Sequence, residues 1–257
     1  ADYNVSVGYG SLTTNVLGSR STALGTSALY NQNPATAVNM YNVAVGYDAG
    51  NAVTTGVENV LIGGLAGDAL LDGDRNVAIG HAALSAATTS DGNSAIGYNA
   101  LAVTTVGNYN VAMGYGAMIA NVNGDRSVGI GVAALAAQAP VSANTDMYNT
   151  AVGYQAGTAV TIGTANTIVG GEAGDALTTG VRNTVVGTYA LTADDLGSYS
   201  TALGYNALAA QNYATATNGY NTAIGARAGE AITTGVQNTL VGSLAGDALA
   251  ASNDNTA

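Results

Sequence analysis

Hydrophobic and polar positions along this chain follow a pattern that restarts about every 17 residues. Asn76–Gly92 and Asn93–Tyr109 align residue for residue, with Asn, Ala, Ile and Gly in the same places. Numbering each unit from this Asn gives fourteen units, which start at Asn4, Ser21, Asn42, Asn59, Asn76, Asn93, Asn110, Ser127, Asn149, Asn166, Asn183, Ser200, Asn221 and Asn238. Ten of the thirteen spacings are 17 residues, and the others are 21, 22 and 21. A short fixed period is typical of a solenoid in which each unit forms one coil.

Each unit opens with a short run of β-branched residues bounded by turn residues, which predicts a strand. Position 5 is Gly in all fourteen units, and position 4 is always Val, Leu, Ile or Met. A helical repeat would not tolerate this much Gly, because each interior Gly costs about 1 kcal/mol relative to Ala. The sequence therefore predicts an all-β fold: one repeat domain over residues 1–257, built as a parallel β-solenoid, or β-roll, of 14 coils.

Two positions of the unit exchange bulk with each other, which indicates a shared interior. Where position 9 is Leu or Met, as at Leu84, position 12 is small or polar, as at Ala87. Where position 9 is Gly, as at Gly67, position 12 is a large aliphatic residue such as Leu70. The exchange holds in all fourteen units, as close packing of a narrow core requires.

The strand of each unit is apolar on both faces. We expect position 4 to face the core and position 3, which includes Leu61, Ile168 and Leu240, to face outward. A strand that is apolar on both faces is buried on both. Another copy of the chain is the simplest cover for the second face.

The three longer units begin with Ser instead of Asn and carry four or five extra residues near their ends. The next unit resumes in register each time. Because solenoids accommodate insertions on one face, residues 31–41, 138–148 and 211–220 are predicted to project as loops or bulges.

Charge and composition restrict the partners. Five Arg and 16 acidic residues give a net charge of -11, with no Lys and no Cys. A nucleic-acid interface needs basic patches, and a disulfide framework or thiolate metal site needs Cys. No apolar run is long enough for a transmembrane helix. We expect neither nucleic-acid binding nor membrane insertion.

The stretches "NVAIG", "NSAIG" and "NTAVGY" resemble the head repeats of trimeric autotransporter adhesins, whose heads are trimers of parallel β-rolls. The 17-residue form "NTAVGYQAG…TTG" is still more similar to repeats in tail-fibre proteins of marine bacteriophages. The resemblance covers the whole chain. It implies a homotrimeric extracellular fibre on a virion or cell surface, with a host-surface glycan or receptor as a further partner.

Motifs that carry chemistry are few, and none predicts catalysis, a cofactor or a metal. The single His, His81, takes position 6, which is Tyr in six other units, so a structural role is expected. "GIGVAA" (Gly129 to Ala134) lacks the following helix that a dinucleotide loop needs. "DGDRN" (Asp72, Asp74, Asn76), echoed by Asn123 and Asp125, has alternating oxygen ligands but not the Gly and distal Glu of a calcium loop. A hydrated turn is the expectation there, with calcium as the alternative.

Three columns of like residues are expected on stacked coils, which lie ~4.8 Å apart. Position 17 collects Tyr and Arg, whose side chains can make cation–π contacts. They form either a stabilising ladder or subunit contact, or an aromatic strip for glycan binding. The Asn residues of position 1 predict a ladder of side-chain amides. Threonines at positions 13 and 14 open an ice-binding alternative, although Leu71, Asp72 and Asp195 interrupt them. The column residues are Tyr3, Arg20, Tyr41, Arg75, Tyr109, Arg126, Tyr148, Arg182, Tyr199 and Tyr220, and Thr54, Thr55, Thr88, Thr89, Thr233 and Thr234.

These patterns predict a structural protein and not an enzyme: the shaft or spacer of an extracellular adhesive fibre, such as a phage tail fibre or virion appendage. The alternatives are a bacterial trimeric adhesin head and the subunit of a self-assembling extracellular filament. "ADY" before Asn4 matches the ends of other units, and "NTA" at residues 255–257 begins another. We therefore expect a segment of a longer chain, cut within repeats at both ends.

Overall fold

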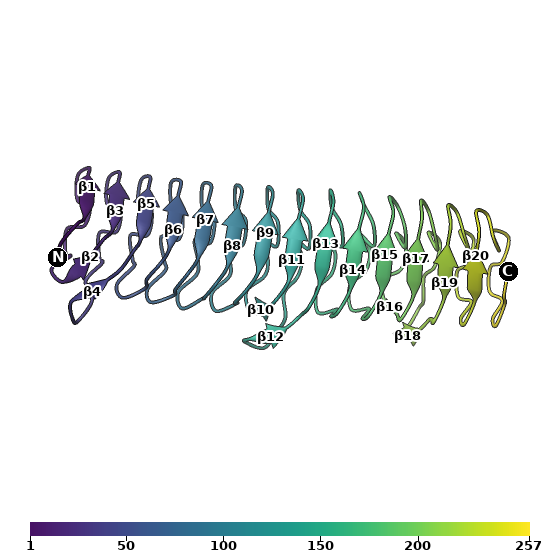
Figure 1. The fold of residues 1–257 in the computed structure, drawn as a ribbon. Coiled ribbons are helices and arrows are strands. Elements are labelled where there is room, and N and C mark those ends of the chain that lie inside the picture. Colours follow the sequence, from purple (N-terminus) through teal and green to yellow (C-terminus); the bar gives the residue numbers. More distant parts are fainter. The chain divides into compact units, whose positions relative to one another are not determined.

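The computed structural model describes residues 1–257 and confirms the predicted fold class (Figure 1). The chain is all-β, contains no helix, and forms a parallel β-solenoid of about fourteen turns. It divides into two compact units, residues 1–126 with 141–145 and residues 127–140 with 146–257. With no helix in the chain, there is none that is long and apolar enough to cross a membrane.

The first unit contains seven three-residue strands, one for each coil, and each covers positions 2–4. They are β1 (Val5–Val7), β3 (Thr22–Leu24), β5 (Val43–Val45), β6 (Val60–Ile62), β7 (Val77–Ile79), β8 (Ser94–Ile96) and β9 (Val111–Met113). From β1 to β9 neighbouring strands pair in parallel with a register of one whole coil, so that Val60 lies beside Val77. Two-residue strands β2 (Gly18–Ser19), β4 (Val38–Asn39) and β10 (Gly124–Asp125) lie near the coil ends.

The second unit repeats this arrangement. Its strands at positions 2–4 are β11 (Val128–Ile130), β13 (Thr150–Val152), β14 (Thr167–Val169), β15 (Thr184–Val186), β17 (Thr201–Leu203), β19 (Thr222–Ile224) and β20 (Thr239–Val241). The short strands β16 (Gly197–Ser198) and β18 (Thr217–Asn218) pair with each other, and β12 (Thr145–Asp146) lies in the middle insertion. The start of every coil therefore falls where the repeat predicts it.

The strand faces are the reverse of the prediction. Position 3 points into the core: Leu61, Ile168 and Leu240 are all 0 % exposed. Position 4 points outward, and its side chains are half-exposed or exposed, as at Met113. The interior of a coil is so narrow that it takes Ala at most copies of position 3. The bulkier β-branched residues therefore lie outside.

The predicted exchange between positions 9 and 12 is confirmed, and position 3 belongs to it as well. Leu84, Ala87 and Leu70 are all fully buried. Gly50 leaves room for Leu61 of the next coil, since a Cβ on Gly50 would lie 2.6 Å from Leu61 Cδ1. Ile168 fills the corresponding space at Gly157, where its Cδ1 would lie 2.8 Å from an added Cβ. The space next to a position-9 Gly is thus filled by position 12 of the same coil and, at Gly50 and Gly157, also by position 3 of the next coil.

The Gly of position 5 is required by the close stacking of the backbones. Its φ lies between 133° and 141° in every coil, a region that only Gly occupies readily. A Cβ on Gly97 would also lie 2.5 Å from the carbonyl oxygen of Gly114 in the next coil. Any side chain here would force the two coils apart.

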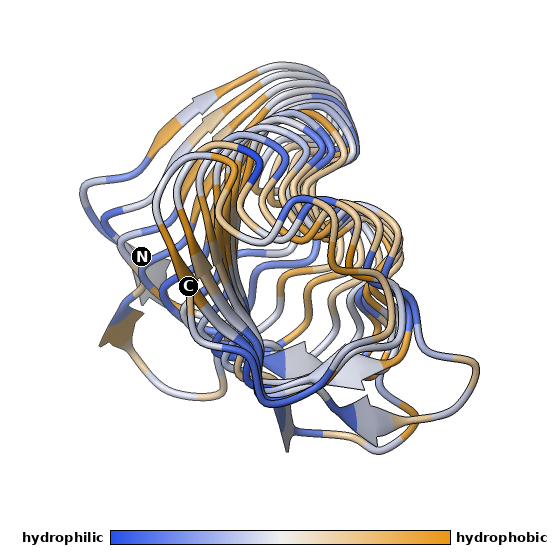
Figure 2. Cartoon of the chain, turned by 90° about the vertical axis from the view of Figure 1, so that its right-hand side faces the viewer, coloured by the Kyte–Doolittle hydropathy of each residue, from blue (hydrophilic) through white to orange (hydrophobic).

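The amide ladder predicted at position 1 is confirmed. The side-chain Nδ2 of Asn76 donates to the Ser90 carbonyl of its own coil at 2.7 Å. Its Oδ1 accepts the backbone N–H of Asn93 from the next coil at 3.0 Å. The same two bonds recur in most coils, for example at Asn59 and Asn166. These buried side chains close each coil and link it to the next one. Figure 2 shows hydrophilic and hydrophobic residues recurring at the same places in successive coils.

The insertions project as predicted, and buried residues hold them at both ends. Residues 35–39 and 214–218 are almost entirely exposed, and β4 and β18 lie at the lower edges of their units in Figure 1. Gln32, Pro34 and Met40 anchor the first insertion and are buried. Where Ser21 replaces the ladder Asn, its Oγ donates to Gln32 Oε1 at 3.1 Å, and Asn42 donates to the same oxygen at 3.0 Å. Gln32 therefore links Ser21 to the Asn42 side chain of the next coil.

Candidate functional site

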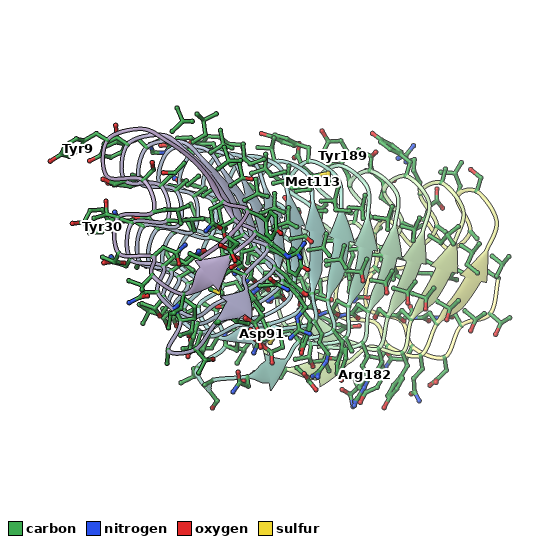
Figure 3. The ribbon with its side chains drawn as sticks, turned by 60° about the vertical axis from the view of Figure 1, so that its left-hand side comes forward. Tyr9, Tyr30, Asp91, Met113, Arg182 and Tyr189 are labelled. Carbon is green, nitrogen blue, oxygen red and sulfur yellow. The ribbon has the colours of Figure 1, made fainter.

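No pocket is found on the chain, and no group of three or more His, Asp or Glu side chains could hold a metal ion. The residues that the sequence singles out lie on the outer surface or in the stacked ladders. Figure 3 shows how densely side chains cover the outside of the coils, with Tyr9 and Arg182 directed away from the ribbon.

His81 lies where the repeat predicts it, in a surface column of aromatic rings. Its ring stacks on Tyr98 with centroids 5.5 Å apart and planes 12° apart. Tyr98 stacks in turn on Tyr115 at 5.3 Å and 7°. His81 thus takes the place of a Tyr in a stack along the first unit.

The dinucleotide-like stretch is part of a coil. Val128–Ile130 forms β11, and Gly131 is the position-5 Gly, with φ 134°. The chain then turns into the next side of the coil, without the helix whose N-terminus would bind a pyrophosphate.

The structure gives the three oxygen ligands of "DGDRN" different surroundings, which weakens the calcium alternative. Asn76 is buried in the amide ladder, whereas Asp72 is exposed. Asp74 Oδ1 instead accepts the backbone N–H of Val57 at 2.8 Å. In the echo of this motif, Asp125 Oδ1 accepts the backbone N–H of Asn108 at 2.7 Å.

These carboxylates belong to a second ladder, at position 16, which the sequence reasoning missed. Asp74, Asp91 and Asn108 lie in successive coils, and each side-chain Oδ1 accepts a backbone N–H from position 16 of the coil before. Ser198 and Asn253 do the same in the second unit. The signal in the sequence was a recurrence of short side chains with an oxygen acceptor, next to the Tyr and Arg residues of position 17.

The Thr columns direct their position-13 hydroxyls along the stack. Thr54 donates to the Leu71 carbonyl at 3.1 Å, Thr88 to Thr105 at 3.2 Å, and Thr233 to Ala250 at 3.1 Å. These hydroxyl protons therefore bond to the backbone of the next coil. That use weakens the ice-binding alternative, which needs hydroxyls directed at water.

The Tyr and Arg side chains of position 17 form the predicted cation–π contacts. The Arg20 guanidinium carbon lies 5.2 Å from the ring centroid of Tyr3 and 5.9 Å from that of Tyr41. Arg126 lies 5.8 Å from the ring of Tyr109. In the second unit Arg182 lies 5.4 Å from the Tyr199 ring, which contacts Tyr220 at 5.2 Å. These contacts cover one face of several rings, while Tyr3, Tyr41 and Tyr109 remain 81 %, 48 % and 55 % exposed.

A buried carboxylate, Asp194, lies beside the third insertion. Burial raises its pKa, while the Gln211 amide, which donates to Oδ2 at 2.6 Å, opposes the shift. The equivalent residue before the other two insertions is Asn15 or Asn121, and there Nε2 of Gln32 or Gln138 has no partner. Asp194 thus supplies an acceptor that the other two sites lack.

Tyr213 in the same insertion is also buried, and burial raises the pKa of its phenol. The hydroxyl donates to the Gly235 carbonyl at 2.9 Å and accepts from Asn221 at 3.0 Å. The first two insertions have Pro34 or Pro140 at this place and bury Met40 or Met147 further along. Here Gly219 replaces the Met, since its Cβ would lie 2.6 Å from the Tyr213 hydroxyl.

The outer face of the strands is uncharged within each unit and carries an unbroken column of aliphatic side chains at position 4, beside Val, Thr or Ser at position 2. Positions 2 and 4 carry only Val, Ile, Leu, Met, Thr and Ser in all fourteen coils. Val7 is 55 % exposed, and Met113 and Leu203 are 42 % and 43 % exposed. No charged side chain interrupts this face.

No known relative of the chain adds to this description. Comparison of the chain with protein-family models, with curated proteins and with solved structures finds no match.

Proposed function

We propose that this chain is a structural shaft or spacer in an extracellular adhesive fibre, in which three copies associate through the outer faces of their strands. The proposal rests on the outer face formed by positions 2 and 4, where every position-4 side chain is aliphatic and no side chain is charged. The resemblance of the sequence repeat to tail-fibre and adhesin repeats favours a virion appendage, with the head of a bacterial adhesin as the alternative.

The physical argument starts from the length of that surface. Seven coils at ~4.8 Å give each unit an apolar strip about 30 Å long. Monomeric soluble proteins rarely expose contiguous apolar patches of more than a few hundred Å². A copy of the same chain presents a matching strip with the same spacing, so its side chains can interdigitate coil by coil. The aliphatic side chains would then leave water without any change in the coil itself.

The interior supports a structural role as well. The fully buried side chains pack between neighbouring coils or complete the amide ladder. Such a design extends by adding coils, since each coil contacts only its neighbours.

The test is the oligomeric state of the purified chain by analytical ultracentrifugation. We expect a trimer at micromolar concentration, and we expect Ile79→Lys, at position 4, to give folded monomers because it would bury an unpaired charge between copies. Thr89→Lys, at an exposed position 14, is the matched control and should leave the trimer intact. A wild-type monomer would contradict the trimer, whereas open-ended polymers would favour the filament. Immunogold labelling of phage particles and of bacterial surfaces then identifies the owner of the fibre.

A further inference from the structure

We propose that the Tyr and Arg clusters at the inserted coils bind the carboxylates of an acidic polysaccharide. This inference rests on the proposed function, because it names the partner of an adhesive fibre. It starts from an uneven distribution of charge: four of the five arginines lie at position 17 of a chain with 16 acidic residues.

The arginines fall into two groups with different partners. Arg75 lies 3.9 Å from Asp74, and Arg227 forms a close ion pair with Glu230. No carboxylate lies within ion-pairing distance of Arg20 or Arg182. Arg20 ends the coil directly before the first inserted coil, and Arg182 reaches the third insertion through Tyr199 and Tyr220. In so acidic a chain, cations left without carboxylates are available for an anion from outside.

Arg20 is already held in a fixed position. Its guanidinium lies between the rings of Tyr3 and Tyr41, and its Nε donates to Asn39 Oδ1 in the first insertion at 3.0 Å. The two Nη atoms make no hydrogen bond within the chain. A guanidinium fixed in this way loses little side-chain entropy when it binds a carboxylate through two parallel hydrogen bonds.

Arg182 forms a second cluster of the same composition in the other unit. It lies over the Tyr199 ring and donates through Nη1 to the Tyr199 hydroxyl. Tyr220, at the end of the third insertion, packs against Tyr199, and its hydroxyl accepts from Asn218 at 3.3 Å. Figure 3 shows Arg182 at the edge of its unit, directed away from the ribbon. Each cluster therefore joins one cation, two tyrosines and an Asn from an exposed loop.

The surroundings favour a sugar polymer over other anions. Hydroxyl and amide groups, which match sugar hydroxyls, flank the cations, and no pocket is present for a peptide side chain. Nucleic acid, with one charge per ~1.7 Å of duplex, would be repelled by a chain of net charge -11. In an acidic polysaccharide the charges are sparser, and repulsion beyond about 8 Å is screened at physiological salt.

A polymer can also engage more than one cluster. Two weak contacts on one flexible ligand raise the overall affinity well above that of either alone.

The experiment measures binding of the chain to immobilised polygalacturonate, and to its methyl ester, by biolayer interferometry. The test variant is R20Q/R182Q. The control is R75Q/R227Q, which also removes two positive charges but only from arginines that are already paired. Both variants therefore have the same net charge, and thermal melts of each check the fold.

We expect the wild type to bind polygalacturonate and not its methyl ester. R20Q/R182Q should weaken binding about tenfold or more, because charge-assisted hydrogen bonds are lost, while R75Q/R227Q stays within about twofold of the wild type. Absence of wild-type binding, or an equal loss in both variants, would overturn the proposal. Light scattering on the same samples separates it from the fibre: a trimer that does not bind refutes only the site, and a monomer that binds refutes only the trimer.

Discussion

The coil that starts at Asn76 offers a direct test of the shared interior. Leu84, at position 9, is fully buried and has a positive φ of 55°, and Ala87, at position 12, is buried three residues later. Leu84→Ala removes the largest fully buried side chain of this coil. We expect a loss of about 2–5 kcal/mol in the free energy of unfolding, since the backbone ladders on both sides prevent the coil from collapsing.

The compensating change follows from the neighbouring coil, where Gly67 at position 9 is combined with Leu70 at position 12. Adding Ala87→Leu to the Leu84 variant should recover part of the loss, because the new side chain enters the same space from the other side. Leu84→Gly with Ala87→Leu should recover more. Gly adopts the positive φ without the roughly 1–2 kcal/mol that other residues require. Recovery stays partial, since the Gly67 coil also contains Leu61, where this coil has the smaller Ala78.

Thermal melts by circular dichroism measure the net effect, at about 2–4 °C per kcal/mol for a chain of this size. Hydrogen exchange on peptides from residues 76–92 and from the distant coil 42–58 locates it. Ala87→Leu alone is the control and should destabilise by about 1–3 kcal/mol through overpacking. If either double variant is no more stable than its Leu84 parent, the two positions do not share one volume.

Two further predictions concern the backbone and the buried acid. Gly97→Ala should destabilise its coil by about 3 kcal/mol or more in urea unfolding, because the Cβ would lie 2.5 Å from the Gly114 carbonyl oxygen. The control, Asn99→Gly, lies two residues further on at φ 55° and should be nearly neutral. Equal effects of the two changes would contradict the role assigned to the position-5 Gly. Burial raises the pKa of folded Asp194 above its unfolded value of 3.8, so its unfavourable contribution is absent at low pH and appears as pH rises through the folded-state pKa. The change in melting temperature caused by Asp194→Asn should therefore be more favourable to the variant at pH 7 than at pH 4, and a pH-independent difference would contradict this reasoning.

The number of coils, their boundaries and the Asn ladder were predictable because they depend on period alone. The face of the strand that points into the core was not predictable in this way. We assigned Ile79 and Met113 to the core because they are larger than Ala78 and Ala112, a rule that holds for wide cores. The interior here accepts one large side chain per coil, so strand residues on the inner face are mostly Ala. Leu61 carried the correct signal, since it follows Gly50 and precedes Gly67, where its bulk is needed.

We did not predict the position-16 ladder or the buried pair of Asp194 and Gln211, for a different reason. Asp74 and Asp91 look like ordinary surface acids in the sequence, and only the stacking distance turns one oxygen of each toward a backbone N–H. For Asp194 the cause is its neighbour in space: Gln211 lies one coil away, 17 residues along the chain. A repeat read one unit at a time does not reveal contacts between the same position of successive units.

The inserted coils differ from the regular ones at several buried positions at once, and this coordination argues that the loops serve a purpose. Each insertion is accompanied by Ser at position 1, Gln at position 12 and Tyr at the end of the coil. Ser and Gln together keep one link of the ladder, as at Gln32 Oε1, which accepts from Ser21 and from the side chain of Asn42 in the next coil. A loop that merely tolerated extra residues would need none of these changes, because solenoids accept insertions on the surface. The terminal Tyr is not needed by the ladder, and it brings an aromatic ring to position 17 beside the loop. The inserted coils therefore combine buried Ser and Gln residues, which link neighbouring coils, with an exposed Tyr at position 17. The exposed Tyr is the part that a partner can contact.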